Sequence, residues 1–200
     1  MPIGVLALQG GFAAHCRMLR SLGADVREVR ELRDLDGLDG LVIPGGESTT
    51  MTLGIEREGL AEPLRALAAA GTPILGTCAG LIMLDREHLR IMDIEARRNA
   101  FGRQVRSFEA DLELAGLDGP PLRAVFIRAP WIAAHGEGVE IIASVDGHAV
   151  AARQDALLAV AFHPELGRDT RLHERFLAAC GCGMRGGRGA QASYRYTTSP

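Results

Sequence analysis

The chain has 200 residues, and the 47% that are hydrophobic are enough to bury one sizeable core, as a single domain requires. The 22 basic and 25 acidic residues leave a formal net charge of −3 without a basic stripe, so neither nucleic acid nor a membrane surface is an expected partner. The apolar runs are too short to span a membrane and the N-terminal segment lacks signal-peptide features, which predicts a cytoplasmic protein.

The first part of the chain has the pattern of a parallel α/β sheet. Residues Ile3–Leu8 are almost wholly apolar and end at a pair of glycines, which predicts a strand buried on both faces. An amphipathic helix follows and ends at Gly23, because glycine accepts the left-handed conformation that stops a helix. The same patterns predict two further strands and a second helix: Val26–Val29, Leu41–Ile43, and a helix through Leu60, Leu64 and Leu67 that ends at Gly71.

Cys78 stands where a buried strand over Pro73–Thr77 is predicted to turn into a helix over Ala79–Arg90. The small residues around it let the backbone make the sharp turn that exposes a nucleophile. The N–H groups and the dipole of the following helix favour a thiolate and can hold an oxyanion. The alternative is that Cys78 is a small buried apolar side chain.

Beyond Phe101 the pattern changes to that of antiparallel strands. Apolar and acidic residues alternate from Phe108 to Leu114, which is typical of a half-exposed strand. Residues 181–200 are rich in Gly and Arg and lack apolar periodicity, so we predict a disordered tail behind a domain of residues 1–180. The other predicted elements are strands at Ala124–Ile127, Val139–Val145, Ala149–Ala152 and Leu157–Phe162 and a helix at Thr170–Cys180. The class is therefore α/β, mostly parallel with an antiparallel extension.

A cysteine nucleophile needs a base, and His163 has the most suitable setting among the six histidines. It follows a predicted strand directly, and Pro164 restricts the loop so that Glu165 can approach the imidazole. Glu165 would then fix the tautomer and stabilise the imidazolium. The alternative is a helix start with Pro164 in its first turn. We expect the other five histidines to be ordinary surface or packing residues.

Other candidate ligand-binding segments follow predicted strands. The glycine pair in Pro44–Thr50 lets backbone N–H groups approach a small anionic or amide ligand, although a tight turn with Ser48 or Thr49 capping the next helix is the alternative. The segment Gln9-Gly10-Gly11 can form part of the same pocket or a plain turn. Arg98 and Arg128 suit a carboxylate, or are surface charges. Cys180 and Cys182 lack companion ligands, so we predict no metal and no disulfide framework.

These segments in this order resemble the class I glutamine amidotransferases, and within them the PdxT/SNO family of glutaminase subunits of pyridoxal 5'-phosphate synthase. The resemblance covers about residues 1–180, whereas the Gly/Arg tail looks foreign to the family and the segment at 85–90 is shorter than is usual there. The segments that carry it are LALQG near the start, PGGESTTM at 44–51, GTCAGL at 76–81, RNAFGRQ at 98–104, FIRAP at 126–130 and FHPEL at 162–166.

The resemblance implies a three-layer α/β sandwich with a flavodoxin-like core, and a triad of Cys78, His163 and Glu165 that hydrolyses L-glutamine to glutamate and ammonia without a cofactor. It also implies a large hetero-oligomer with a TIM-barrel synthase subunit (PdxS), which uses the ammonia for vitamin B6 biosynthesis. We expect backbone N–H groups of Gly46 and Ala79 to form the oxyanion hole. The glutamine-binding residues that it implies are Gly46, Glu47, Ser48, Arg98, Ile127 and Arg128.

Two other functions are compatible with the same residues. One is the glutaminase subunit of a different amidotransferase, such as imidazole glycerol phosphate synthase, which would share the triad. The other is a non-catalytic module on the same fold in which Cys78 senses thiol oxidation. A cysteine peptidase is a more distant alternative, because nothing in the sequence suggests a groove for an extended chain.

Overall fold

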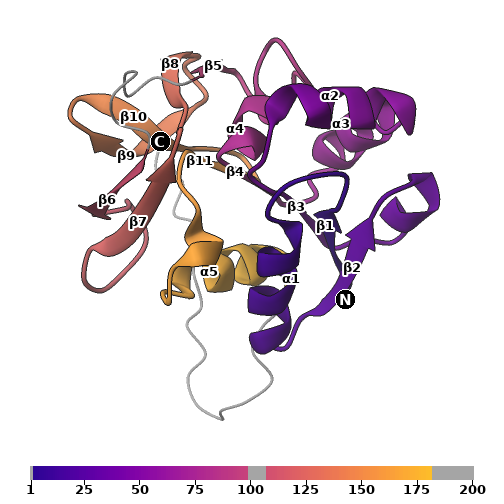
Figure 1. Ribbon diagram of the computed structural model, residues 1–200, viewed down its shortest axis with the longest axis horizontal. Coiled ribbons are helices and arrows are strands. Elements are labelled where there is room, and N and C mark those ends of the chain that lie inside the picture. The colour runs from indigo at the N-terminus through magenta and orange to yellow at the C-terminus, as the bar shows by residue number, and fades with distance from the viewer. Residues whose placement is uncertain (1, 99–106, 182–200) are drawn as a thin grey trace, which may run out of the picture.

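A computed structural model of the chain describes residues 2–98 and 107–181 (Figure 1). The first part contains β1 (Pro2–Leu6), α1 (Phe12–Ser21), β2 (Asp25–Val29), the short 3-10 helix η1 (Leu32–Leu35), β3 (Gly40–Ile43), α2 (Ser48–Arg57), α3 (Ala61–Ala69), β4 (Ile74–Thr77) and α4 (Ala79–Leu84). The second part contains β5 (Ile94–Arg97), β6 (Ser107–Leu112), β7 (Leu122–Ile127), β8 (Trp131–His135), β9 (Glu140–Val145), β10 (His148–Gln154), β11 (Leu157–Val160), the 3-10 helix η2 (Pro164–Leu166) and α5 (Arg171–Ala179).

Among the described residues, nine strands form one sheet, with β9 paired to β10 beside the order β2-β1-β3-β4-β11-β10-β8-β5. The first five strands of that order run parallel, and the remaining pairings are antiparallel. Strands β1, β3, β4 and β11 are almost entirely buried, as their apolar sequences predict. The mostly parallel sheet with an antiparallel extension is therefore confirmed.

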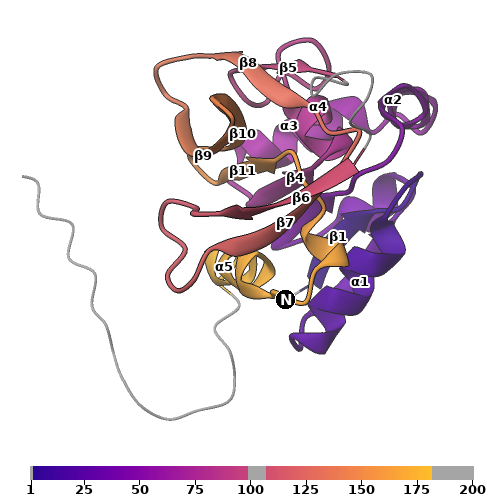
Figure 2. The same ribbon diagram turned by 60° about the vertical axis from the view of Figure 1, so that its left-hand side comes forward.

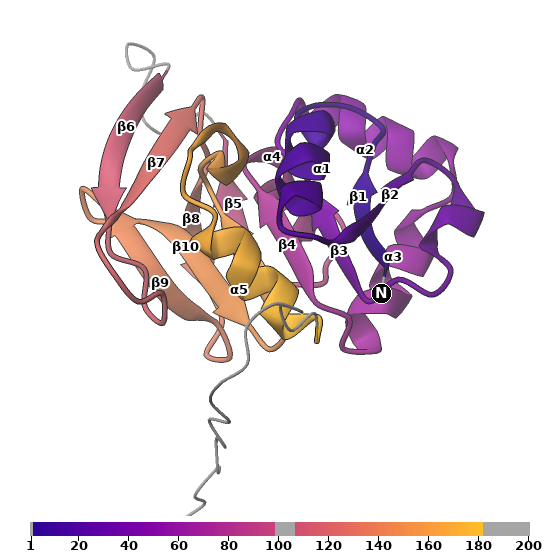
Figure 3. The ribbon, with the colours of Figure 1, turned by 90° about the horizontal axis from the view of Figure 1, so that it is seen from below.

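Helices cover both faces of this sheet and make three layers. Figures 2 and 3 show α1 and α5 together on one face, with α2, α3 and α4 on the other. Strands β6 and β7 form a separate two-stranded antiparallel sheet, in which β6 alternates between more and less exposed residues as predicted. None of the helices in residues 2–98 and 107–181 has the length and apolar character needed to cross a membrane.

The helix predicted over Ala79–Arg90 is too long, because α4 ends at Leu84. Asp85 is extended there and its carboxylate accepts the backbone N–H groups of Glu87 and His88 at 2.9 and 3.0 Å. A short polar side chain that binds nearby N–H groups competes with the helical hydrogen bonds, and the helix stops.

Four elements, η1, α2, β5 and β8, have no counterpart among the predicted strands and helices. Helix α2 has a threonine-rich sequence with a glycine and therefore a weak intrinsic preference, but a cap at its first turn and two buried side chains, Met51 and Ile55, stabilise it. Strands β5 and β8 are short and only partly buried, and they pair with each other at the antiparallel edge. The tail from residue 182 onward, and all of the segment RNAFGRQ at 98–104 except Arg98, lie outside the described residues.

Candidate active site

The backbone of Cys78 occupies a conformation that few residues adopt. Its φ and ψ are 49° and −106°, at the join between β4 and α4. Two glycines make this turn possible, because a Cβ at Gly80 would lie 1.9 Å from the carbonyl oxygen of Ile43 and one at Gly76 would lie 2.7 Å from that of Gly80. The residue is 7% exposed, and its sulfur lies 3.9 Å from the carbonyl oxygen of Ile127. The sequence pattern of a nucleophile elbow thus corresponds to a real strained turn.

His163 follows β11, which lies beside β4, and it reaches the same place as Cys78. Gly45 separates the two side chains, since a Cβ there would lie 2.5 Å from Cε1 of His163 and 3.1 Å from Cβ of Cys78. Nδ1 of His163 lies 2.8 Å from Oε1 of Glu165. The helix start that the alternative interpretation predicted is also present, as η2 begins at Pro164, but the carboxylate of Glu165 faces the imidazole.

Electrostatics hold His163 and Glu165 as an ion pair. Burial disfavours charge on His163, but hydrogen bonds and charge interactions with Cys78 and Glu165 outweigh it and raise the pKa of His163 from 6.5 to about 10. Burial likewise opposes charge on Glu165, but His15 and His163 bind its carboxylate and shift the pKa of Glu165 well below 4.5. The imidazole is therefore charged and oriented at neutral pH.

Two histidines that were expected to be ordinary surface or packing residues belong to this network. His15 on α1 and His173 on α5 are both 0% exposed. Nδ1 of His15 lies 2.9 Å from Nε2 of His173, and Nε2 of His15 lies 3.2 Å from Oε2 of Glu165. The available sequence signal was a histidine on the apolar face of each helix, beside Cys16 and Leu19 in α1 and between Leu172 and Phe176 in α5.

The free energy of unfolding should fall between pH 7 and pH 5 partly because of His173. Burial, and then the neighbouring His15, lower the pKa of His173 from 6.5 to about 3. Between these values the unfolded chain binds a proton that the folded chain does not, so stability is lost as pH decreases, by at most about 1.4 kcal/mol per pH unit. In urea unfolding at the two pH values, His173→Gln should lose about 2 kcal/mol less than the wild type over this interval. Parallel losses would contradict this assignment.

The loop after β1 and the loop after β3 are joined by hydrogen bonds. The backbone N–H of Gly11 donates to the carbonyl of Gly45 at 2.9 Å, and that of Glu47 donates to the side-chain oxygen of Gln9 at 2.7 Å. Gly10 has a φ of 89°, and a Cβ there would lie 1.9 Å from the carbonyl oxygen of Gly45. The two segments that the sequence placed at one sheet edge therefore form one wall of a pocket.

This wall, Cys78 and His163 enclose a cavity of about 340 Å³. The structure brings all six predicted glutamine-binding residues and Ala79 to its lining: Gly46, Glu47, Ser48, Ala79, Arg98, Ile127 and Arg128. Glu165 is not among the lining residues and stands behind His163. Arg98 approaches the wall, with its guanidinium 3.4 Å from Oγ of Ser48.

The carboxylate of Glu47 has a local role in this wall. It caps α2 by accepting the backbone N–H groups of Thr49 and Thr50 at 3.1 and 2.7 Å. The alternative prediction that Ser48 or Thr49 caps this helix is therefore wrong by one residue or two. With its side chain engaged, Glu47 offers a ligand chiefly its backbone.

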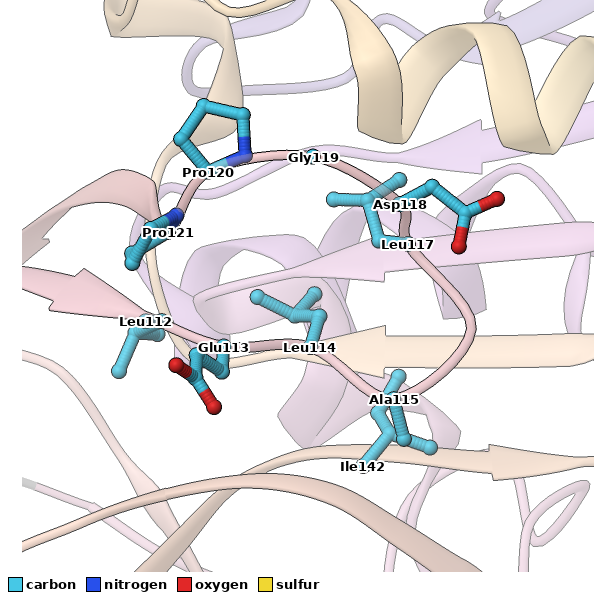
Figure 4. A pocket seen from close by; sticks show the side chains of 10 residues that line it. All are labelled: Leu112, Glu113, Leu114, Ala115, Leu117, Asp118, Gly119, Pro120, Pro121 and Ile142. Atoms are coloured by element: carbon cyan, nitrogen blue, oxygen red, sulfur yellow. The ribbon is translucent and has the colours of Figure 1, made fainter.

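A second cavity, of about 470 Å³, lies between the loop that joins β6 to β7 and strand β9 (Figure 4). Leucine, alanine, proline and isoleucine dominate its lining, and no histidine or cysteine is present there. Glu113 and Asp118 supply its two carboxylates, and none of the other described residues that line it is a histidine, cysteine, serine or threonine. Reactive side chains meet in the smaller cavity, which is therefore the candidate active site.

Within residues 2–98 and 107–181 no cluster of three or more His, Cys, Asp or Glu side chains is arranged to hold a metal ion.

Known proteins resemble this chain over most of its length. Residues 5–181 match the model of the SNO glutamine amidotransferase family. The pyridoxal 5'-phosphate synthase subunit PdxT of Dehalococcoides mccartyi is 54% identical in an alignment of 187 positions that covers 88% of this chain and 96% of that protein. The protein of the same name from Acidothermus cellulolyticus is 54% identical in an alignment of 190 positions that covers 88% of this chain and 92% of that protein.

A solved structure agrees with the sequence comparisons. A crystal structure described as a glutamine amidotransferase superimposes with a TM-score of 0.84 and 44% sequence identity, over 90% of this chain and 98% of that one. The fold is thus that of the class I glutamine amidotransferases, and the chain belongs to the SNO glutamine amidotransferase family.

Proposed function

We propose that this chain is the glutaminase subunit of a pyridoxal 5'-phosphate synthase, and that Cys78, His163 and Glu165 are its catalytic triad. The observation that carries the proposal is their convergence at one sheet edge. A strained turn presents the cysteine, and Cys78 and His163 both lie against Gly45. Glu165 binds Nδ1 of His163, the ring nitrogen that is not used by Cys78. This arrangement suits acyl transfer from an amide.

The triad divides the reaction into two displacements. Nδ1 of His163 is engaged by Glu165, so Nε2 serves Cys78. The proton of the Cys78 thiol passes to Nε2 before the chemical step, which gives the charged imidazole, and the thiolate sulfur attacks the side-chain carbonyl carbon of glutamine. The carbon–nitrogen bond then breaks, Nε2 protonates the leaving nitrogen, and ammonia and a thioester result. Water, deprotonated by His163, attacks the thioester and releases glutamate and the thiol.

The cavity lining supplies the binding contacts of the proposal. Backbone N–H groups of Gly46 and Ala79 stabilise the oxyanion, the latter at the start of α4 where N–H groups lack helical partners. Arg98 and Arg128 suit the substrate carboxylate, because a guanidinium binds a carboxylate with two parallel hydrogen bonds. Gly46, Glu47, Ser48 and Ile127 complete the glutamine-binding surface from the two sides of the cavity.

The partner of this subunit is, in this proposal, a TIM-barrel synthase subunit in a large cytoplasmic hetero-oligomer. The support is that the relatives from Dehalococcoides mccartyi and Acidothermus cellulolyticus are named as subunits of pyridoxal 5'-phosphate synthase. Ammonia released beside water becomes ammonium, which is not nucleophilic, so a docked partner that receives it directly retains its reactivity.

Glutamate release should be slow for the isolated chain and rise at least about tenfold when the synthase subunit is added, because a docked partner would close the cavity and exclude water from it. The measurement is glutamate production with and without the partner, together with labelling of Cys78 by a glutamine-mimicking diazo-ketone. Stimulation by a different synthase alone would favour another amidotransferase. Absence of both turnover and labelling in the assembled complex would favour a thiol-sensing module.

A further inference from the structure

We propose that His15 is a positioning residue for this reaction, whose Nε2–H holds the second carboxylate oxygen of Glu165, and that His173 fixes the tautomer of His15 that makes this contact possible. The inference rests on the proposed function, because it concerns the support behind the third member of the triad. His15 does not line the cavity, so it acts through Glu165.

The two oxygens of Glu165 have unequal surroundings. Oε1 accepts from Nδ1 of His163 at 2.8 Å. Oε2 is buried and, among residues 2–98 and 107–181, has no hydrogen-bond donor in good geometry, while Nε2 of His15 lies 3.2 Å away. That nitrogen also lies 3.1 Å from Oγ1 of Thr77. A proton on Nε2 can therefore be shared between the hydroxyl and the carboxylate, and the side chains of His15 and Glu165 are 0% and 1% exposed.

The hydrogen-bond inventory selects the tautomer. If Nδ1 of His15 carried a proton and donated it to His173, the remaining N–H of His173, on its Nδ1, would be buried without an acceptor. In the neutral form of that arrangement a lone pair of His15 would also face Oε2 of Glu165. The reverse order avoids both costs: Nε2–H of His173 donates to Nδ1 of His15, and Nε2–H of His15 faces Glu165. Only an acceptor on His173 is then unpartnered, which is better tolerated than an orphaned N–H.

This chain of contacts fixes the acid relative to the nucleophile. His15 lies on α1, Glu165 in η2, and Thr77 is the residue before Cys78. A carboxylate held at both oxygens keeps one orientation and stays ionised when His163 takes up a proton, and donors fixed in a buried site stabilise that charge without reorganising. The expected effect is on the chemical step and not on glutamine binding.

The test compares two substitutions at His15 in the full-length chain assembled with the synthase subunit. His15→Leu removes the donor, whereas His15→Gln places an amide N–H near the position of Nε2. We expect kcat for glutamate release to fall about tenfold to a hundredfold in His15→Leu, with KM within about twofold of the wild type, because one hydrogen bond to a buried charge is lost. His15→Gln should recover most of the rate. Rates are divided by the concentration of Cys78 that the diazo-ketone can label, so that unfolded protein does not lower the measured kcat.

Leu19→Ala is the matched control, since Leu19 lies one turn further along α1, is equally buried at 0% exposure, and belongs to the apolar core. Leu19→Ala should lower the unfolding temperature, but at temperatures where this variant is folded its kcat should equal that of the wild type. A wild-type kcat in His15→Leu, or equal losses in His15→Leu and His15→Gln, would overturn the proposal. Failure of the wild-type complex itself to release glutamate would instead refute the proposed function.

Discussion

Replacing Cys78 with alanine is expected to abolish glutamate release by the assembled complex, by at least about 10⁴-fold, because no other group in the cavity can form the thioester. The residues that line the cavity include no second cysteine. The fold should survive, since alanine at this position keeps Cβ and removes only the sulfur. The measurement is a coupled glutamate assay, with far-ultraviolet circular dichroism as the check on folding.

Cys16→Ala is the control for this variant. Cys16 is also buried, at 1% exposure, but it lies in the hydrophobic core away from the cavity, and burial raises the pKa of its thiol, which makes it unreactive. This variant should retain wild-type turnover and diazo-ketone labelling, whereas Cys78→Ala should lose both. Residual labelling in Cys78→Ala would point to a different nucleophile.

Replacing Gly80 with alanine is expected to lower the free energy of unfolding by about 3 kcal/mol or more and to reduce turnover at least about a hundredfold. The new Cβ would lie 1.9 Å from the carbonyl oxygen of Ile43, and a backbone atom cannot move aside as a flexible side chain does. Helix α4 must therefore shift away from β3, and the turn that holds Cys78 would move with it. Urea unfolding and the glutamate assay measure the two effects.

Gly138→Ala is the matched substitution for this comparison. A Cβ at Gly138 meets nothing within 4 Å, and the residue has no positive φ, so alanine should leave stability within about 0.5 kcal/mol and turnover unchanged. If Gly80→Ala behaved in the same way as Gly138→Ala, the close packing of α4 against β3 would not be what holds the elbow.

The positions of the buried strands along the chain were predictable because each strand of the parallel sheet has a short apolar sequence and a turn after it. Since parallel strands end at one edge, the sequence also placed Cys78, His163 and the loop at 44–50 together. The predicted helix end at Arg90, which is wrong, and the missed helix α2 share a cause. In each case a single carboxylate, of Asp85 or of Glu47, decides where backbone N–H groups find a partner. A single capping residue leaves a weaker signal in the sequence than the regular spacing of apolar residues does.

The buried histidines could not be predicted in the same way. His15 and His173 are 158 positions apart, and their contact exists only because α1 and α5 lie together on one face of the sheet. Each histidine alone fits an amphipathic helix, and only the packed structure shows that neither side chain reaches solvent. Their relation to Glu165 is a property of the tertiary structure.

The bonds between the loops after β1 and β3 also have a mechanical consequence. Gly11 and Gln9 are tied to Gly45 and Glu47, and Gly11 directly precedes α1, the helix that carries His15. Neither loop can swing outward without dragging the other. A ligand that contacts these two loops should therefore reduce the motion of the N-terminus of α1. Ligand binding would then affect His15 and His173, although the ligand contacts neither side chain.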